Sequence, residues 1–204
     1  LKKGIALTPV KFGISFTLTH LNQAGALVHI YQDGSIRINH GGTEMGQGLF
    51  QKVAQVAAQE FSQPITNVKI TATDTGKVPN TSATAASSGS DLNGMAIQAA
   101  CNKSKKRIKL FLAKIHQVKT SEIAFKDGQV KIGNKVDSFN NIIKVAYENR
   151  ISLSATGFYA TPEIKWDRIK GKGNPFYYFS YGAAVTEVII DTLTGENRIL
   201  RTDI

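Results

Sequence analysis

Residues 41–48 read GGTEMGQG, and the pattern of apolar residues changes across this segment. Before it, residues 26–31 and 36–38 alternate around Asp33-Gly34, which predicts a β-hairpin with a type I′ turn. After it, one face of a predicted amphipathic helix that ends before Pro64 is formed by Leu49, Val53, Val56, Ala57 and Phe61. The segment therefore joins a strand to the start of a helix.

The glycines of this segment predict a site for an anion. They let backbone N–H groups approach a ligand closely, and a helix start adds unpaired donors and a partial positive charge. Gln47 supplies a neutral donor and acceptor, whereas the Glu44 carboxylate would repel an anion and is expected to point away. The segment matches neither the Walker A nor the Gly-x-Gly-x-x-Gly pattern. A corner with no ligand remains an alternative.

A second candidate wall is residues 80–91, NTSATAASSGSD, where almost every side chain is small. It precedes a helix expected to begin with Ser90 or Asp91 as N-cap and to reach Ile115, with a possible interruption near residues 102–106. Small side chains leave room for a bulky cofactor, and further hydrogen bonds could come from the hydroxyls of Thr84, Ser87 and Ser88. The alternative is a flexible linker. If the two helix starts lie side by side, they would together form one anion-binding surface.

The remaining segments alternate hairpins with helices. Residues 22–25 are expected to form a loop and residues 151–174 to be mixed and loop-rich. Extended or hairpin segments are expected at residues 4–16, 68–73, 123–132 and 177–204, and a further helix at 139–148. This order predicts an α+β fold with antiparallel or mixed sheets, β-hairpins and packed amphipathic helices. No internal boundary is evident, and residues 91–150 are interpreted as a helical and hairpin insert.

Composition narrows the class of protein. The chain has 204 residues, 42% hydrophobic, with a formal charge of +10. Its basic run at residues 103–109 surrounds apolar residues at helical spacing, which favours a solvated helix face over nucleic-acid binding. No segment has the roughly 20 apolar residues of a membrane span. The single cysteine, Cys101, leaves no disulfide framework or thiolate-held cluster and fits a cytoplasmic location, and the scattered histidines indicate no metal site.

Several motifs together resemble the molybdenum-binding large subunit of xanthine dehydrogenases, in bacterial form. They occur in family order at residues 11–17, 21–27, 41–48, 80–91, 156–159 and 194–204. The resemblance covers essentially the whole chain and implies that residues 1–204 are part of a molybdopterin-binding domain. In that family the whole enzyme oxidises hypoxanthine and xanthine with oxygen derived from water. It passes electrons through iron–sulfur centres and FAD to NAD.

The resemblance also implies roles for individual residues. The substrate contacts would be Phe16, Thr17 and Ala85. The contacts to molybdenum-molybdopterin would be Met45, Gly46, Gln47, Thr84, Ala86 and Ser87. Gly89 stands where some relatives have serine, so the contact there is in doubt.

No catalytic residue and no metal ligand is assigned, since the family's general-base glutamate lies outside these residues. The chain alone is therefore expected to be inactive. Its expected partners are the rest of the molybdenum subunit, a subunit carrying the iron–sulfur and FAD centres, and a purine. The alternatives are an aldehyde oxidase-like molybdenum hydroxylase and a stand-alone phosphate- or nucleotide-binding module.

Overall fold

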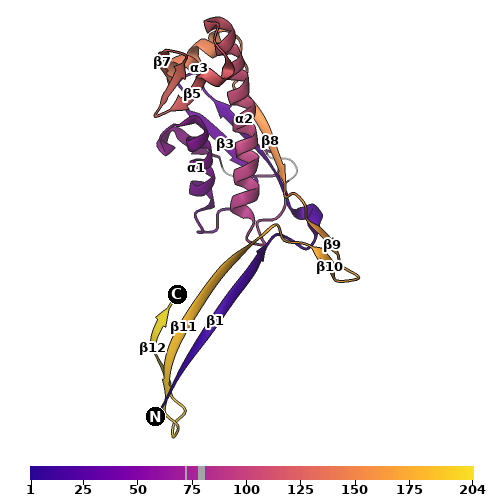
Figure 1. Cartoon of the computed structure of the whole chain (residues 1–204), viewed down its shortest axis with the longest axis vertical. Coiled ribbons are helices and arrows are strands. Elements are labelled where there is room, and N and C mark those ends of the chain that lie inside the picture. Colours follow the sequence, from indigo (N-terminus) through magenta and orange to yellow (C-terminus); the bar gives the residue numbers. More distant parts are fainter. Residues whose placement is uncertain (72, 78–80) are drawn as a thin grey trace. The chain divides into compact units, whose positions relative to one another are not determined.

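The chain folds into two compact units. The computed structural model describes residues 1–71, 73–77 and 81–204 (Figure 1). One unit comprises residues 1–17 and 163–204, and the other comprises residues 18–162. The sequence did not indicate this division. Ala72, at the end of the expected strand 68–73, and Asn80, in the small-residue tract, lie outside the described residues.

The unit formed by residues 1–17 and 163–204 is built from antiparallel strands. Its main sheet has the order β1-β11-β12, and the strands are β1 (Lys2–Ile14), β11 (Tyr178–Ile190) and β12 (Asn197–Asp203). A separate hairpin consists of β9 (Lys165–Asp167) and β10 (Lys172–Asn174). The expected extended start and terminal hairpin are confirmed. Many apolar side chains of the main sheet are exposed, among them Ile5 at 74% and Leu7 at 64%.

The unit formed by residues 18–162 has a four-stranded mixed sheet at its centre. Its order is β4-β3-β2-β8, from strands β2 (Gln23–Ile30), β3 (Ile36–His40), β4 (Val68–Ile70) and β8 (Ser154–Ala160). Only the β3–β4 pair is parallel, so the predicted mixed sheet is confirmed. β2 begins inside the expected loop at residues 22–25. β8 lies where the sequence indicated loops, because Ala155 and Gly157 carry too little apolar surface to mark a strand.

Two helices pack on this sheet, and a third packs against a small second sheet (Figure 1). α1 (Leu49–Phe61) and α3 (Phe139–Glu148) lie at the predicted positions. α2 (Gly89–His116) begins before the expected N-cap and runs through residues 102–106 without interruption. The expected interruption is wrong because Cys101 and Ser104 are both fully buried on the packed face, while neighbouring lysines remain at the surface. The short 3₁₀ turns are η1 (Thr19–Leu21), η2 (Ile65–Asn67) and η3 (Thr120–Glu122).

The helix–sheet packing depends on small residues and on branched apolar side chains. A Cβ added to Gly157 on β8 would lie 1.9 Å from the backbone oxygen of Ala96 on α2, so this strand and helix touch through their backbones. Fully buried side chains fill the interior, among them Val28, Ile38, Val53, Ile97 and Ile108. Burying each such side chain contributes about 1.5–3 kcal/mol.

The two Asp-Gly turns differ. Between β2 and β3, Gly34 N–H donates to Tyr31 O at 2.9 Å and Tyr31 N–H to Ser35 O at 2.9 Å, which makes a three-residue loop. The expected type I′ turn there is wrong, because only Gly34 has a positive φ. The small sheet β5-β6-β7 has a two-residue turn with positive φ at Asp127 and Gly128. Its strands are β5 (Ile123–Lys126), β6 (Gln129–Ile132) and β7 (Lys135–Ser138).

Candidate functional site

The glycine loop, residues 41–48, and the small-residue tract, residues 80–91, line one cavity. The cavity has a volume of about 490 Å³ and lies at the starts of α1 and α2. Six of the residues singled out in the sequence line it, namely Met45, Gln47, Thr84, Ala85, Ala86 and Ser87. Gly46 lies within the same loop. The structure thus brings the two predicted walls together, although what they bind remains a prediction.

Three predicted site residues are not part of this cavity lining, namely Gly46 in the glycine loop and the two predicted substrate contacts Phe16 and Thr17. Phe16 and Thr17 follow β1 in the unit formed by residues 1–17 and 163–204. Phe16 is half-buried and Thr17 is exposed. Their proposed substrate contacts therefore remain a sequence-based prediction.

The start of α1 is closed by Glu44. Its carboxylate accepts hydrogen bonds from the backbone N–H groups of Gly46 at 2.9 Å, Gly48 at 3.0 Å and Phe50 at 2.9 Å. These bonds, the one from Phe50 foremost, lower the pKa of Glu44 below its ordinary value. The expectation that Glu44 points away from a ligand stays a prediction. Glu44 is not among the residues that line the cavity, and its carboxylate binds the unpaired donors of the helix start.

Gln47 folds back onto the same loop. Its Oε1 accepts a hydrogen bond from Met45 N–H at 2.6 Å, and its Nε2 donates to Thr43 O at 2.9 Å. Gly46 and Gly48 have φ of 97° and 74°, which other residues rarely adopt. The loop is therefore held by its own side chains, while one Nε2 proton of Gln47 remains for another acceptor.

Two glycines at the base of the loop are required by close packing. A Cβ on Gly41 would lie 2.1 Å from Thr81 Oγ1, and one on Gly42 would lie 2.6 Å from Leu49 Cδ2. The backbone N–H of Thr43 donates to Thr84 Oγ1 at 2.8 Å, which links the loop to the small-residue tract. These glycines thus serve contacts within the chain, where the sequence had suggested close approach to a ligand.

The start of α2 has no comparable side-chain cap. Ser88 is the N-cap residue, but its hydroxyl donates to Ala85 O at 3.1 Å and makes no capping bond to the helix. Ala86 and Ser87 have positive φ of 53° and 55°, a conformation that costs a non-glycine residue free energy. Within the described part of the chain, the Ser87 hydroxyl has no hydrogen-bond partner, which leaves it available to a ligand.

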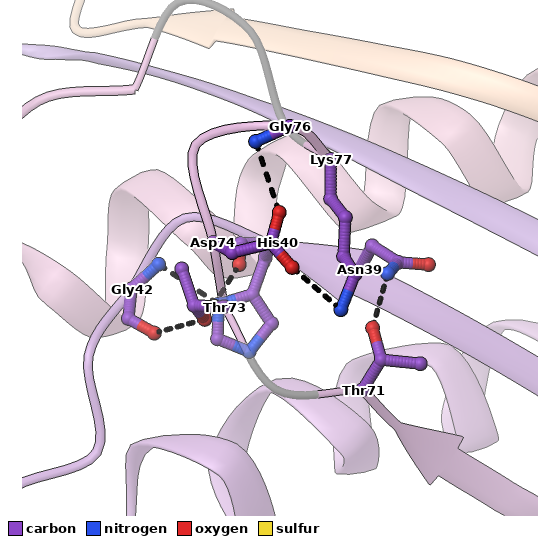
Figure 2. A network of polar contacts seen from close by, with 8 residues as sticks. All are labelled: Asn39, His40, Gly42, Thr71, Thr73, Asp74, Gly76 and Lys77. Carbon is purple, nitrogen blue, oxygen red and sulfur yellow. Dashed lines mark hydrogen bonds and ion pairs between the residues drawn. The ribbon is translucent and has the colours of Figure 1, made fainter.

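A polar network fixes the segment that follows β4 against the end of β3 (Figure 2). Thr73 Oγ1 lies 3.1 Å from His40 O and 3.2 Å from Gly42 O. Asn39 Nδ2 donates to Thr71 Oγ1. Further along, Asp74 accepts a hydrogen bond from Gly76 N–H at 2.9 Å and pairs with Lys77 at 2.8 Å. The Thr73 contacts hold the base of the glycine loop at His40 and Gly42.

Sequence reasoning missed two charged or titratable residues of the site. Lys52 lines the cavity from the first turn of α1, four residues after Gly48, and this helical spacing was the signal that could have found it. His40, one of the histidines for which the sequence indicated no metal site, is 1% exposed at the base of the loop. Burial lowers the pKa of His40 to about 4, opposed by Asn93 and by the charge of Glu44.

Other site types find little support in the residues described. Among them, no group of three or more histidine, cysteine or acidic side chains is placed to hold a metal ion. None of the described helices combines the length and apolar character that crossing a membrane requires. Cys101 is a buried free thiol whose pKa is raised to about 12 by burial.

Comparison with known proteins adds the family. The model of the molybdopterin cofactor-binding domain matches residues 1–204. The chain is 49% identical to a xanthine dehydrogenase/oxidase of Gallus gallus over 203 residues, all of this chain and 14% of that protein. It is 48% identical to a xanthine dehydrogenase of Oryza sativa subsp. japonica over 203 residues, 100% of this chain and 13% of that protein. The predicted resemblance is therefore confirmed, for a chain that spans about 14% of such relatives.

A solved structure shares the fold. Quinoline 2-oxidoreductase from Pseudomonas putida 86 aligns with a TM-score of 0.82 at 20% identity, over 98% of this chain and 26% of that one. This likeness confirms the predicted α+β class. With the family model matching from the first residue to the last, the chain belongs to the molybdopterin cofactor-binding domain family.

Proposed function

We propose that this chain forms one wall of the molybdopterin site of a xanthine dehydrogenase-type hydroxylase. The single observation that carries the proposal is the cavity of about 490 Å³ between the glycine loop and the small-residue tract. It is supported by identities of 44–49% to xanthine dehydrogenases over the whole chain. Bound molybdopterin would supply the redox chemistry that hydroxylates hypoxanthine or xanthine with oxygen from water.

The residues that line the cavity fit such a group. Ala85 and Ala86 leave room for a flat ring system, and Ser87 offers an unused hydroxyl. Gln47 retains a neutral donor, which can contact a ligand without adding charge. We therefore assign the cofactor contacts to Met45, Gly46, Gln47, Thr84, Ala86 and Ser87, as the resemblance implies.

The anionic part of the ligand belongs on the α2 side of the cavity. At the start of α1 the donors are already bound to Glu44, so a second anion there would meet a negative charge. At the start of α2 the N-cap residue Ser88 makes no capping bond, although Asp91 lies in the first turn of the helix. Lys52 supplies the positive charge that lines the cavity.

The remaining parts of the reaction belong to partners. The rest of a molybdenum subunit would supply the general base, and the resemblance implies purine contacts for Phe16, Thr17 and Ala85. Electrons would leave through iron–sulfur and FAD centres to NAD, on another subunit or domain, in the cytoplasm. The exposed apolar side chains of the β1-β11-β12 sheet suit burial against such partners.

One alternative is weakened by the geometry. A stand-alone phosphate- or nucleotide-binding module would use the glycine loop as its anion site, but Glu44 fills that position. An aldehyde oxidase-like substrate range is the nearer alternative. Assaying purine and aldehyde oxidation side by side in the longer enzyme separates the two.

Filling the cavity tests the proposal. In a longer polypeptide that carries this chain, made in a host that synthesises the cofactor, Ala85→Trp should lower bound molybdenum and pterin at least about tenfold, equivalent to roughly 1.4 kcal/mol. Ala83→Trp is the matched control, since Ala83 is exposed in the same tract but does not line the cavity. Equal cofactor content in both variants would refute the assignment. For the 204-residue chain alone we expect poor cofactor binding and no xanthine oxidation.

A further inference from the structure

His40 is the last residue of β3 and stands at the base of the glycine loop. Its side chain is almost completely buried, and its Nδ1 accepts a hydrogen bond from the backbone N–H of Gly42 at 3.1 Å. An acceptor nitrogen carries no proton, so the neutral ring must carry its proton on Nε2. The geometry of one backbone bond thus fixes the tautomer of this imidazole.

His40 Nε2, on the other edge of the ring, and Asn93 Oδ1 in α2 are both buried, and neither has a hydrogen-bond partner among the described residues. Asn93 raises the pKa of His40, against the larger, opposing effect of burial. Asn93 Nδ2 is already used, since it donates to Gly89 O at 2.8 Å in the first turn of α2.

The surroundings leave little freedom for the ring or the loop. A Cβ on Gly42 would lie 2.7 Å from Asn93 Nδ2, so loop and helix are in close contact here. The Phe50 ring stands edge-on to the imidazole at 5.2 Å between centroids. Thr73 holds His40 O and Gly42 O from the opposite side (Figure 2). The charged group that acts on His40 is Glu44, within the same loop.

We propose that His40 is a positioning residue that sets the separation of the two cavity walls. Its neutral, Nε2-protonated ring holds the backbone of Gly42 in the glycine loop, and Gly42 in turn packs against Asn93 in α2. A proton on Nδ1 would face the N–H of Gly42 and break the hydrogen bond. The hydrogen bond between Gly42 and His40 forms without any ligand. Only an effect of His40 on the amount of bound cofactor rests on the proposed function.

Two substitutions of His40 test the roles of its two ring nitrogens one at a time. His40→Asn keeps a polar atom at the Nδ1 position, and His40→Gln keeps one at the Nε2 position. In hydrogen exchange of the 204-residue chain, the Gly42 amide should stay within about threefold of wild type in His40→Asn. It should exchange at least roughly tenfold faster in His40→Gln, because a buried hydrogen bond is lost. Equal exchange in the two variants would overturn the proposal.

A measurement on the wild-type chain does not depend on variants that fold. Nitrogen NMR of the His40 ring should show a neutral imidazole with its proton on Nε2 from pH 8 to 5 and titration only near pH 4. A proton on Nδ1, or a charged ring at pH 6, would overturn the proposal. In the longer polypeptide, fast Gly42 exchange with unchanged bound molybdenum would count against the proposed function and leave the positioning role intact.

Discussion

The two helix starts that line the cavity look alike in sequence and differ in structure. One follows the glycine loop and the other the small-residue tract, and each was expected to offer free donors to an anion. At α1 the donors are bound by Glu44, whereas α2 has no side-chain cap. One carboxylate at the right spacing therefore turns a potential ligand site into a rigid support. The N-cap residue of α2, Ser88, makes no such bond, and the proposed function assigns the anionic part of the ligand to that helix start.

The backbone shows the same contrast. Positive φ at α1 falls on Gly46 and Gly48, where it costs little, but near α2 it falls on Ala86 and Ser87. Strain of this kind persists where surrounding structure holds it, and it is concentrated at functional sites. The glycine loop at α1 carries its positive φ on glycines and is capped by its own side chain, which suits it to support the site. The small-residue tract at α2 carries its positive φ on non-glycine residues, which suits it to contact a ligand.

Wedging the two walls apart should have the largest effect. Gly42→Val would place atoms about where Leu49 and Asn93 now lie, so we expect a loss of about 3 kcal/mol or more in the free energy of unfolding. Gly46→Ala is the control, because nothing lies within 4 Å of its added Cβ and only its φ is unfavourable, which costs about 1–2 kcal/mol. Urea unfolding of the chain measures both. A smaller loss for Gly42→Val than for Gly46→Ala would show that the walls are not in close contact.

Removing the Glu44 carboxylate should change amide exchange at the start of α1 and leave the start of α2 unaffected. Glu44→Ala should speed amide exchange at Gly46, Gly48 and Phe50 several-fold, whereas Ser88→Ala should leave the start of α2 unchanged, since Ser88 makes no capping bond. Hydrogen exchange followed by NMR measures each amide. Equal effects at the two helix starts would remove the distinction between them.

The same wall should respond to acid. Because the pKa of Glu44 is lowered in the folded chain, its contribution is present above the unfolded value and is lost as pH falls through the folded one. Protection of the three amides should therefore decline on acidification below about pH 4.5 in wild type. In Glu44→Gln, which keeps an acceptor oxygen but cannot titrate, it should not decline.

The sequence was sufficient for elements whose signal is local. The apolar spacing of residues 49–61 and 139–148 gave both helices, because a single buried stripe specifies them. Gln47, Thr84 and Ser87 were singled out by their polar groups, whereas Ala85 and Ala86 were assigned by family resemblance, since small side chains carry no chemical signature of their own. β8 was missed for the same physical reason, as its packed face uses Ala155 and Gly157.

What sequence could not provide were contacts that depend on three dimensions. The carboxylate of Glu44 was judged by its charge relative to a hypothetical ligand, while its proximity to the amides of its own loop decided the outcome. His40 and Asn93 are far apart in the chain, so nothing local pairs them. The two-unit division follows from β1 pairing with β11, a contact between the ends of the chain.

The smallest expected effect is a gain in stability at the strained wall. Ala86 has a φ of 53°, which costs an alanine about 1–2 kcal/mol relative to glycine, while glycine gives back roughly 0.5–1 kcal/mol through the unfolded chain. Ala86→Gly should therefore raise the free energy of unfolding by up to about 1 kcal/mol. Ala85→Gly, one residue earlier and without positive φ, should lower it. Urea unfolding of both variants gives the sign. If Ala86→Gly destabilises as much as Ala85→Gly, the wall at α2 stores no strain, and its openness must come from the missing cap alone.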